Sequence, residues 1–366
     1  MSASTGISLH AVSKRYGAVE VVSDLSLTIE PGRVVALLGP SGCGKTTTLR
    51  LIAGLERVSG GTLRVGDRVV DDGAEVFVPP EARGLGMVFQ SYALWPHMSV
   101  RDNVAYPLKL RGQSSSVRAA AATAALSRVH LEHLQERFVH QLSGGQQQRV
   151  AVARAVVGDG EKSPGVLLLD EPLANLDARL REEMRSELAM LARTSGATVV
   201  LVTHDQQEAF AVADEVVVLD KGRLAQQGRP NEIYLRPVSA FVGAFGGSMD
   251  VVAGSLVEDG LRIGAVTLRR GVVHVAGDLA GAVQVGLRPE WLRPAVDGEA
   301  GLDVTVRQRL FLGREYELVL TLDDGAALGW RWPSTTPPPA IGDRLRIVPV
   351  RACAFGVRPS QEQQAS

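Results

Sequence analysis

A glycine-rich turn followed by a lysine and a threonine is the segment of this sequence best suited to chemistry. It fits the pattern G-x-x-x-x-G-K-[ST] and lies between an apolar run, Val34–Leu38, and a helical pattern that begins at Thr47. Glycines let backbone N–H groups turn inward around a phosphate, and the N-terminus of the following helix supplies further free donors. We therefore predict a nucleotide phosphate site, with the Lys45 ammonium at the β- and γ-phosphates and the Thr46 hydroxyl within reach of Mg²⁺. The predicted site comprises Gly39, Pro40, Ser41, Gly42, Cys43, Gly44, Lys45, Thr46 and Thr47.

Two acidic residues close a second apolar run. Val166–Leu169 is followed directly by Asp170 and Glu171. Adjacent residues at the end of a strand point in different directions, so two roles fit. We predict that Asp170 orients Mg²⁺ through water and that Glu171 polarises the attacking water as a general base. Alone, the pair could equally be an exposed acidic turn, but the phosphate-binding turn in the same chain favours the catalytic interpretation.

A third segment, Leu142–Gln146, is a Ser-Gly-Gly turn that opens a helix. Ser143 and Gly145 would present a hydroxyl and backbone N–H groups at a helix N-terminus, which makes a second anion site. The two phosphate sites of one chain would lie too far apart to share one ATP, so a head-to-tail dimer that sandwiches two nucleotides is the simplest solution. A plain helix cap would not explain the paired glycines. The residues assigned to this second site are Ser143, Gly144, Gly145 and Gln146.

The size and composition of the chain limit what else it can be. Its 366 residues suit two or three domains, and 45% of them are hydrophobic, which is enough for a core. With 39 Lys and Arg against 40 Asp and Glu, the net charge of -1 argues against nucleic-acid binding driven by bulk charge.

The two cysteines, Cys43 and Cys353, fit a reducing compartment better than a disulfide framework. We expect no signal peptide in Met1–Leu9 and see no apolar run near the ~20 residues that span a bilayer, so a role at a membrane would require a partner.

Apolar runs and helical patterns alternate over the first two thirds of the chain. Short runs rich in Leu and β-branched residues predict strands buried on both faces, and helices between them imply a mostly parallel sheet covered by helices. Two earlier runs, Ile7–Val12 and Asp24–Ile29, alternate more and predict a smaller antiparallel sheet. The predicted buried strands are Val34–Leu38, Val166–Leu169, Thr198–Thr203 and Val216–Leu219, and the predicted helices are Thr47–Leu55, Ser116–Arg128, Gln146–Val157 and Ala178–Thr194.

The pattern changes after about Phe245, where helical signals largely end. Short alternating runs separated by Gly, Asp and Pro predict a small β-barrel or sandwich. We expect the boundary within Arg236–Ser248, which carries Pro237 and three glycines, and we predict a disordered polar tail at Ser360–Ser366. The predicted strands of this second domain are Val251–Leu256, Val272–Ala276, Gly281–Leu287, Val304–Leu310, Tyr316–Leu322 and Arg344–Val350.

Taken in order, these motifs resemble those of the ATPase subunits of ABC transporters. The resemblance rests on the phosphate-binding turn, the Asp170–Glu171 pair and Leu142-Ser143-Gly144-Gly145-Gln146, and it covers roughly residues 5–235. It implies an α/β P-loop NTPase domain that binds ATP and Mg²⁺ and works as a head-to-tail homodimer. One departure is a segment at 158–165 that is a few residues longer than is usual for the family, which we interpret as a tolerated loop insertion.

The same resemblance implies roles for four further residues. Tyr16 is similar to the aromatic residue that stacks on adenine, although it could instead be a core tyrosine. Gln90 resembles the Q-loop glutamine that touches Mg²⁺ and senses the transporter, and Asp177 resembles the D-loop aspartate that faces the partner subunit. His204 resembles the switch histidine that contacts the γ-phosphate. The predicted catalytic residues are Glu171, His204 and Gln90, and the predicted Mg²⁺ ligands are Thr46, Gln90 and Asp170.

Two features indicate an importer. Residues 91–100 are rich in aromatic residues and Met and resemble the segment that receives the coupling helices of importer membrane subunits, with packing inside the domain as the alternative. Gly286–Glu290 resembles a motif of the TOBE domain, an OB-like all-β barrel appended to many importer ATPases, over roughly residues 240–360. We therefore predict an ABC ATPase domain at 5–235 and a TOBE-like β-barrel domain at 245–359, for which a scaffold role is favoured over ligand sensing.

The resemblance also implies partners and a location. We expect two integral-membrane permease subunits, an indirect link to a substrate-binding protein, no nucleic acid, and a peripheral position at the cytoplasmic face of the inner membrane. The group that the chain resembles serves ferric iron, polyamines, phosphonates, sulfate and sugars, and the segments Leu94–His97 and Phe311–Gly313 favour ferric iron or a polyamine. The alternatives are a soluble ABC ATPase with no membrane partner, an exporter, and a regulator whose working part is the C-terminal barrel.

Overall fold

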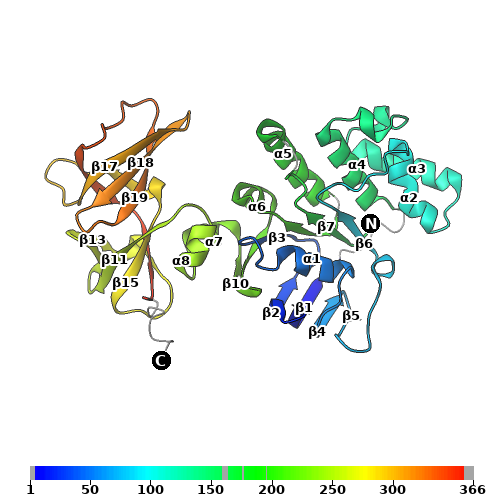
Figure 1. Cartoon of the computed structure of the whole chain (residues 1–366), viewed down its shortest axis with the longest axis horizontal. Helices are drawn as coiled ribbons and strands as arrows, with labels where there is room; N and C mark the ends of the chain where they lie inside the picture. The colour runs from blue at the N-terminus through cyan, green and yellow to red at the C-terminus, as the bar shows by residue number, and fades with distance from the viewer. Residues whose placement is uncertain (1–4, 159–163, 175–176, 195, 358–366) are drawn as a thin grey trace. The chain divides into compact units, whose positions relative to one another are not determined.

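The chain folds into two compact units. The computed structural model describes residues 5–158, 164–174, 177–194 and 196–357, and it divides into a first unit, Met1–Pro230, and a second unit, Asn231–Ser366. Figure 1 shows the elements of both units. Among the described residues, no helix is long and apolar enough to cross a membrane.

A six-stranded sheet forms the centre of the first unit. Its order is β10-β9-β3-β8-β7-β6, and every neighbouring pair is parallel except β9 and β10. All residues of β3, β7 and β8 are buried, because helices or further strands cover both faces. The predicted parallel sheet is therefore confirmed. The strands are β3 (Val34–Leu38), β6 (Leu85–Val88), β7 (Val166–Asp170), β8 (Thr198–Val202), β9 (Glu215–Asp220) and β10 (Arg223–Gly228).

A smaller antiparallel sheet of order β2-β1-β4-β5 completes the strand content of this unit. Helix α1 (Lys45–Ala53) packs on it, and Figure 1 shows the helix beside β1 and β2. One apolar cluster contains side chains from both sheets and from α1, so burial holds the start of α1 in a fixed place. The predicted small sheet is confirmed, with two strands more than expected. Its strands are β1 (Ile7–Tyr16), β2 (Val19–Ile29), β4 (Gly60–Val65) and β5 (Arg68–Asp71).

Three helices form a separate apolar cluster beside the central sheet. They are α2 (Val100–Leu110), α3 (Ser115–Arg128) and α4 (Gly144–Val156), and α4 contacts β6. Helix α2 was not predicted, because Pro107 interrupts its pattern. The side chain of Ser99 caps it, and burial of Val104 and Leu108 overrides the local preference. The remaining helices of this unit are α5 (Ala178–Thr194) and α6 (Gln206–Val212), and α5 has the predicted bounds.

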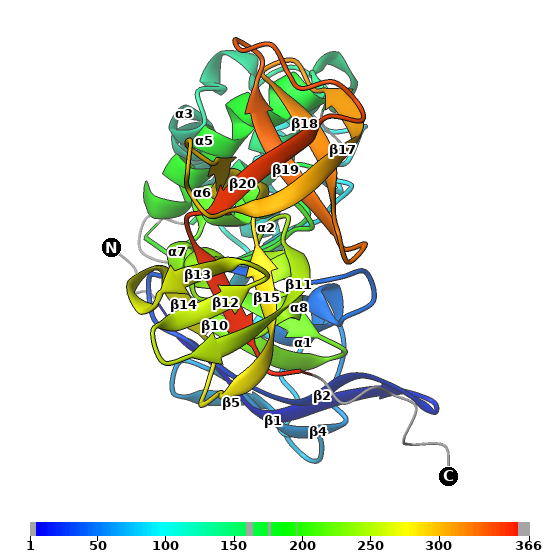
Figure 2. The same cartoon turned by 90° about the vertical axis from the view of Figure 1, so that its left-hand side faces the viewer.

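Two antiparallel-rich sheets share one core in the second unit. A six-stranded sheet has the order β13-β12-β11-β15-β21-β14 and a five-stranded sheet has the order β16-β20-β17-β18-β19. Figure 2 shows them as two layers, and buried side chains from both belong to one cluster. The predicted all-β, barrel-like domain is confirmed. The strands are β11 (Asp250–Val257), β12 (Gly260–Ile263), β13 (Val266–Arg269), β14 (Val273–Val275), β15 (Gly281–Leu287), β16 (Leu292–Pro294), β17 (Leu302–Phe311), β18 (Glu315–Leu322), β19 (Ala327–Pro333), β20 (Arg344–Pro349) and β21 (Ala352–Phe355).

Several sequence predictions differ from the structure in detail. The strand expected at Val272–Ala276 is shorter, because Val272 ends a 3-10 turn, Arg270–Val272. Two short helices, α7 (Pro230–Leu235) and α8 (Ala240–Phe245), precede the second sheet domain and were not predicted, since six residues are too few for a helical period. Most of the expected loop insertion at 158–165 and the tail Ser360–Ser366 lie outside the described residues. The other 3-10 turns are Pro80–Ala82, Glu132–Leu134, Val139–Gln141 and Pro289–Trp291.

A buried arginine explains the Gly286–Glu290 motif of the second unit. The Arg288 side chain is fully buried and donates hydrogen bonds to the carbonyls of Tyr234 (2.9 Å), Gly247 (2.8 Å) and Ser248 (3.2 Å). Its guanidinium lies 3.9 Å from the centroid of the Tyr234 ring. Burial lowers the pKa of Arg288 to about 10, so the charge remains at neutral pH. The motif therefore ties α7 and the segment after α8 to the sheets.

Candidate functional site

One cavity of the first unit brings together residues from three of the predicted motifs. Its volume is about 540 Å³, and its lining includes the phosphate-binding turn, Glu171 and His204. Such a volume lies in the range of small-molecule sites, roughly 300–1,000 Å³. The lining residues are Val21, Ser41, Gly42, Gly44, Lys45, Thr46, Thr47, Glu171 and His204.

The glycine-rich turn has the backbone that its sequence demands. Gly39, Gly42 and Gly44 have φ values of 151°, 79° and 100°. A Cβ atom at Gly39 would lie 2.4 Å from the carbonyl oxygen of Leu219, and one at Gly44 would lie 2.8 Å from that of Val21. The chain thus needs glycine at these points for conformation and for space. Helix α1 follows at once, and its N-terminus has no side-chain cap, so its backbone N–H groups are left for a ligand.

The predicted phosphate lysine is held inside this turn. The Lys45 ammonium donates hydrogen bonds to the carbonyl oxygens of Gly39 (2.7 Å) and Pro40 (2.9 Å), and 7% of the residue is exposed. The thiol of Cys43 is buried 3.8 Å from the same nitrogen. Burial raises the pKa of Cys43 more than the neighbouring ammonium lowers it, so the thiol stays neutral and acts as packing. The positive charge in the turn is therefore that of Lys45.

The predicted Mg²⁺ ligands Thr46 and Asp170 lie side by side. The Thr46 hydroxyl donates to the Asp170 carboxylate at 3.4 Å, although 124 residues separate them in sequence. Strand β7 ends at Asp170 and α1 follows the end of β3, so both residues lie at the carboxyl edge of the parallel sheet, with β8 between the two strands. Burial raises the pKa of Asp170, while the Thr46 hydroxyl and Arg50 lower it. A hydroxyl and a carboxylate are both oxygen donors that suit a hard cation.

The three predicted catalytic side chains meet at the end of β7. Glu171 has a φ of 45°, which a non-glycine residue rarely adopts, and its carboxylate accepts a hydrogen bond from the Gln90 amide at 3.1 Å. Its other oxygen lies 3.5 Å from His204 Nδ1. The backbone N–H of Glu171 bonds to the carbonyl of Val202 on β8. Strain of this kind is typical of active sites, since the surrounding structure must hold it.

A buried carboxyl group supports the loop that carries His204. The Thr203 hydroxyl donates to Glu208 at 2.6 Å and accepts from the backbone N–H of Asp205 at 3.0 Å. Asp205 caps α6, and 2% of Glu208 is exposed. Burial raises the pKa of Glu208 to about 7. Sequence reasoning missed Glu208; an acid in the first turn of a predicted helix usually faces solvent, and only the fold shows its burial.

The aromatic side chain of Tyr16 lies on the surface. It is 43% exposed, which excludes the alternative of a core tyrosine. Lys14 Nζ lies 4.8 Å from the centroid of its ring and pairs with Glu56 at 3.0 Å. Burial of the hydroxyl, followed by the Glu56 charge, raises the pKa of Tyr16. The ring is therefore available for stacking and has a cation on one side.

The Ser143 turn does not line the cavity of its own chain among the residues that the structure describes. Ser143 caps α4 by accepting from the Gln146 N–H at 3.4 Å, and Gln146 accepts from the Ser143 N–H at 3.0 Å. Ser143 and Gly144 are exposed, whereas Gly145 packs against Leu180. Asp177 is exposed and caps α5 through the Leu180 N–H at 3.0 Å. Asn175 and Leu176 of the predicted D-loop lie outside the described residues.

The segment after Gln90 is half inside the domain. Tyr92 is buried, and the rings of Trp95 and Tyr106 lie 4.2 Å apart between centroids. Ala93, Pro96 and His97 are exposed. The segment therefore packs internally in part, as the alternative interpretation required, and presents the rest of its surface to solvent.

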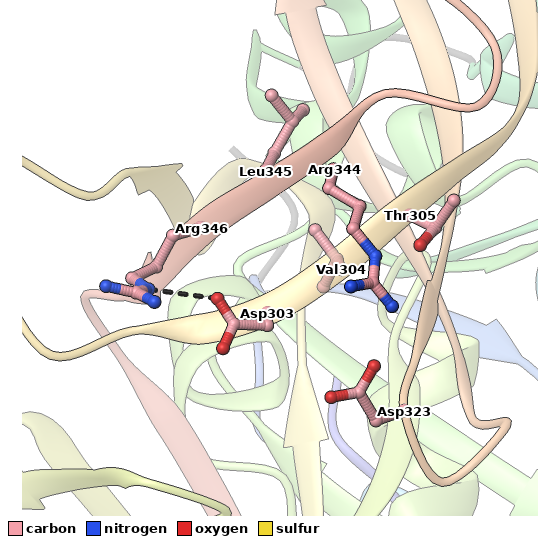
Figure 3. Close-up of a pocket in the computed structure, with 7 residues that line it drawn as sticks. All are labelled: Asp303, Val304, Thr305, Asp323, Arg344, Leu345 and Arg346. Carbon is pink, nitrogen blue, oxygen red and sulfur yellow. Dashed lines mark hydrogen bonds and ion pairs between the residues drawn. The ribbon is translucent and has the colours of Figure 1, made fainter.

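A second cavity lies on the five-stranded sheet of the other unit. Figure 3 shows it between β17 and β20, with a volume of about 420 Å³. Its charged groups are exposed, and Arg346 donates to Asp303 at 2.9 Å. In the same view the Arg344 guanidinium points toward the side of Asp323. Exposed ion pairs contribute little energy, and no predicted site residue lines this cavity, so it is a weaker candidate.

Comparisons with known proteins agree with this geometry. Residues 22–174 match the ABC transporter domain family and residues 285–354 match the TOBE domain family. The sulfoquinovosyl glycerol transport ATP-binding protein of Agrobacterium fabrum is 41% identical over 95% of this chain and 97% of its own length. The Fe(3+) ions import ATP-binding protein of Pasteurella multocida is 43% identical over 87% of this chain and 89% of its own length.

A solved structure shows the same likeness in the first unit. The dimeric structure of a bacterial ABC transporter cassette is 31% identical, has a TM-score of 0.52, and covers 61% of this chain and 98% of the cassette. A further structure of that cassette is a post-hydrolysis dimer bound to ADP and phosphate. Since relatives more than 40% identical cover almost the whole chain, the predicted resemblance is confirmed. This chain belongs to the ATP-binding, ATP-hydrolysing subunits of ABC importers, with a nucleotide-binding domain of the P-loop class followed by a TOBE domain.

Proposed function

We propose that the cavity at the start of α1 binds MgATP and that its hydrolysis there drives solute import through separate membrane subunits. The observation that carries the proposal is that the phosphate-binding turn, Glu171 and His204 line one cavity. In this proposal the nucleotide-binding domain spans 5–235 and the TOBE domain spans 245–359. Tyr16 stacks on adenine, and the turn from Gly39 to Thr47 holds the phosphates.

Hydrolysis requires water to attack the γ-phosphorus while the bond to the β–γ bridging oxygen breaks, which gives ADP and phosphate. Glu171 receives the proton of the attacking water, because it is a carboxylate already aligned by Gln90 and His204. Lys45 and the N–H groups at the start of α1 stabilise the charge that spreads over the phosphate oxygens. His204 contacts the γ-phosphate once the nucleotide is bound.

The residues around Asp170 suit Mg²⁺. Thr46 and Asp170 supply neighbouring oxygen donors, and Gln90 would supply a third. In this proposal the substrate phosphates complete the set of oxygen ligands. When bound, Mg²⁺ neutralises charge on the β- and γ-phosphates.

The exposed Ser143 turn supports a head-to-tail homodimer. Ser143 and Gly145 of one copy complete the γ-phosphate site of the other, with Gly144 and Gln146 shaping the turn and Asp177 facing the partner copy. The dimeric state of the related cassette agrees with this arrangement. Hydrolysis then reopens the dimer.

Two permease subunits are the proposed membrane partners, with an indirect link to a substrate-binding protein and no role for nucleic acid. The exposed part of residues 91–98 would receive them, since a docking groove needs both packed walls and an open surface. This places the chain at the cytoplasmic face of the inner membrane as a peripheral subunit.

Ferric iron is the proposed substrate, because two relatives that are 43% and 45% identical are Fe(3+) ions import subunits. Sulfoquinovosyl glycerol is the second candidate, since the relative that serves it matches 95% of this chain.

Uptake of labelled ferric iron, spermidine, sulfate, maltose and sulfoquinovosyl glycerol should be compared in cells whose only copy carries Lys45→Ala. Loss of iron uptake alone would support the proposal, and loss of another uptake would reassign the substrate. Loss of none, with no permease co-purifying, would favour a soluble ATPase.

A further inference from the structure

We propose that Arg154 is a positioning residue that carries movement of the Ser143 turn to the docking segment, residues 91–98. The inference rests on the proposed function, because it requires a dimer that closes on ATP. It connects two motifs that are at least 45 positions apart in the sequence, counted from Met98 to Ser143. Its basis is the set of contacts that the Arg154 guanidinium makes.

Arg154 is a buried cation that bonds to backbone instead of an acid. It lies in the last turn of α4 and is 8% exposed. Its two terminal nitrogens donate to the carbonyl oxygens of Ala93 (2.6 Å) and Tyr92 (2.7 Å). Within the described residues it forms no ion pair, and burial lowers its pKa. A planar guanidinium with two parallel donors fixes direction as well as distance, so the docking segment is oriented by α4.

The two carbonyls belong to strained residues. Tyr92 has a φ of 60° and Ala93 a φ of 46°, so two consecutive non-glycine residues lie in the left-handed region. A non-glycine residue in this region is strained, and it persists only when neighbouring groups hold it. Arg154 donates a hydrogen bond to the carbonyl oxygen of each of these two residues.

A ring contact extends the connection along the segment. The Arg154 guanidinium lies 5.0 Å from the centroid of the Trp95 ring, and that ring contacts Tyr106. The side chain of Asn103 on α2 donates to the Trp95 carbonyl (3.0 Å) and accepts from its N–H (2.9 Å). The docking segment is therefore tied to α4 by Arg154 and to α2 by Asn103.

Helix α4 links Arg154 to the nucleotide. It starts at the turn that Ser143 caps and runs without a break to Val156. Eleven residues separate Ser143 from Arg154, which is about 16 Å along a helix that rises 1.5 Å per residue. When ATP in the opposite copy binds the Ser143 turn, α4 moves as one rod, and Arg154 passes that movement to Tyr92, Ala93 and Trp95.

The test follows Trp95 by fluorine NMR in the full-length chain. The protein is labelled with 5-fluorotryptophan in a Glu171→Gln background, and the Trp95 signal is assigned with Trp95→Phe. We expect MgATP to shift the Trp95 signal as the dimer forms, and Arg154→Lys to abolish most of that shift without weakening ATP binding. Arg101→Lys is the matched control, since Arg101 pairs with Glu136 on the surface and does not contact the segment.

A second variant separates transmission from mere support of a strained loop. Ala93→Gly relieves the left-handed conformation, so Ala93→Gly with Arg154→Lys should still lack the shift if Arg154 transmits movement. Recovery of the shift in the double variant would overturn the inference, as would an unmoved Trp95 signal in a chain that dimerises with MgATP. A chain that binds MgATP without dimerising, by size-exclusion chromatography, would overturn the proposed dimer and the inference with it.

In cells, Arg154→Lys should reduce uptake severalfold while the basal ATPase of the purified chain is unchanged.

Discussion

Two buried cations, Lys45 in the first unit and Arg288 in the second, are both held by backbone carbonyls, but only Lys45 lines a cavity. Lys45 lines a cavity of about 540 Å³ and donates hydrogen bonds to two carbonyls of the glycine-rich turn. Arg288 has no exposed surface, bonds three carbonyls and lies over the Tyr234 ring. The comparison shows that a buried charge marks a binding site only when it faces an open space and its partners can be exchanged.

The same contrast holds for the acidic groups of the two units. Glu171 is held in a strained backbone conformation, and its carboxylate contacts the side chains of Gln90 and His204. In the second unit Glu299 pairs with Arg293, and Asp303 pairs with Arg346. Each of these two carboxylates is neutralised by an arginine. The predicted catalytic residues, in contrast, all lie in the first unit.

Substitution of the strained acid should have the largest effect. Glu171→Gln keeps the size of the side chain but removes the base, so we expect a loss of ~10²-fold or more in ATP turnover, with ATP binding and the dimer retained. Phosphate release by the purified chain measures the turnover. Glu183→Gln is the control, because Glu183 is exposed and forms a surface ion pair with Arg179. Near-normal turnover in Glu171→Gln would exclude Glu171 as the base.

Removal of Arg288, the fully buried cation, should lower the stability of the chain and not its ATP turnover. Arg288→Met leaves the carbonyls of Tyr234, Gly247 and Ser248 without their donor, and we expect a loss of about 2–4 kcal/mol in unfolding free energy. Trp291, Trp330 and Trp332 lie in this unit, so tryptophan fluorescence during denaturant unfolding reports on it. Arg346→Met, at an exposed pair, should cost less than about 1 kcal/mol. If the two variants lost equal amounts of unfolding free energy, the expected difference between a fully buried and an exposed arginine would be contradicted.

Glu208 should make stability depend on pH. Its pKa is raised from 4.5 to about 7 in the folded chain, mainly by burial, with Asp205 raising it and Thr203, Arg185 and Arg181 lowering it. The folded state binds a proton that the unfolded state has lost, so the contribution of this group to stability is complete below 4.5 and falls as the pH rises through about 7. Glu208→Gln removes this decline and should gain on the order of 1–3 kcal/mol relative to the parent chain across that window. Parallel thermal unfolding curves for the two proteins at every pH would disprove the assignment.

The smallest expected effect concerns nucleotide affinity. Tyr16→Ala removes an exposed ring and should weaken ATP binding by about 1 kcal/mol, close to fivefold, whereas Tyr16→Phe keeps the stacking surface and should bind nearly as well. Titration with a fluorescent ATP analogue would measure both. If the alanine variant bound ATP like the parent, adenine stacking on Tyr16 would be ruled out.

The sequence by itself determined the local chemistry of this protein. The glycine-rich turn, the acidic pair after β7 and the Ser143 turn are short segments whose spacing dictates backbone conformation, and each has the predicted local structure. The parallel sheet also followed from local patterns, because a strand buried on both faces needs apolar residues at every position. The second unit was predicted as all-β, but its strands β12, β13, β16, β19 and β21 were missed. All of these except β19 have only three or four residues, which carry too little pattern.

The tertiary structure alone decided which distant residues meet. Thr46 contacts Asp170 and Gln90 contacts Glu171 because parallel strands end at one edge of the sheet, and strand order cannot be read from local periodicity. The burial of Glu208 and the contacts of Arg154 with Tyr92 and Ala93 are of the same kind. An acid or an arginine on a helix is exposed by default, and only the packing of other elements around it changes its environment.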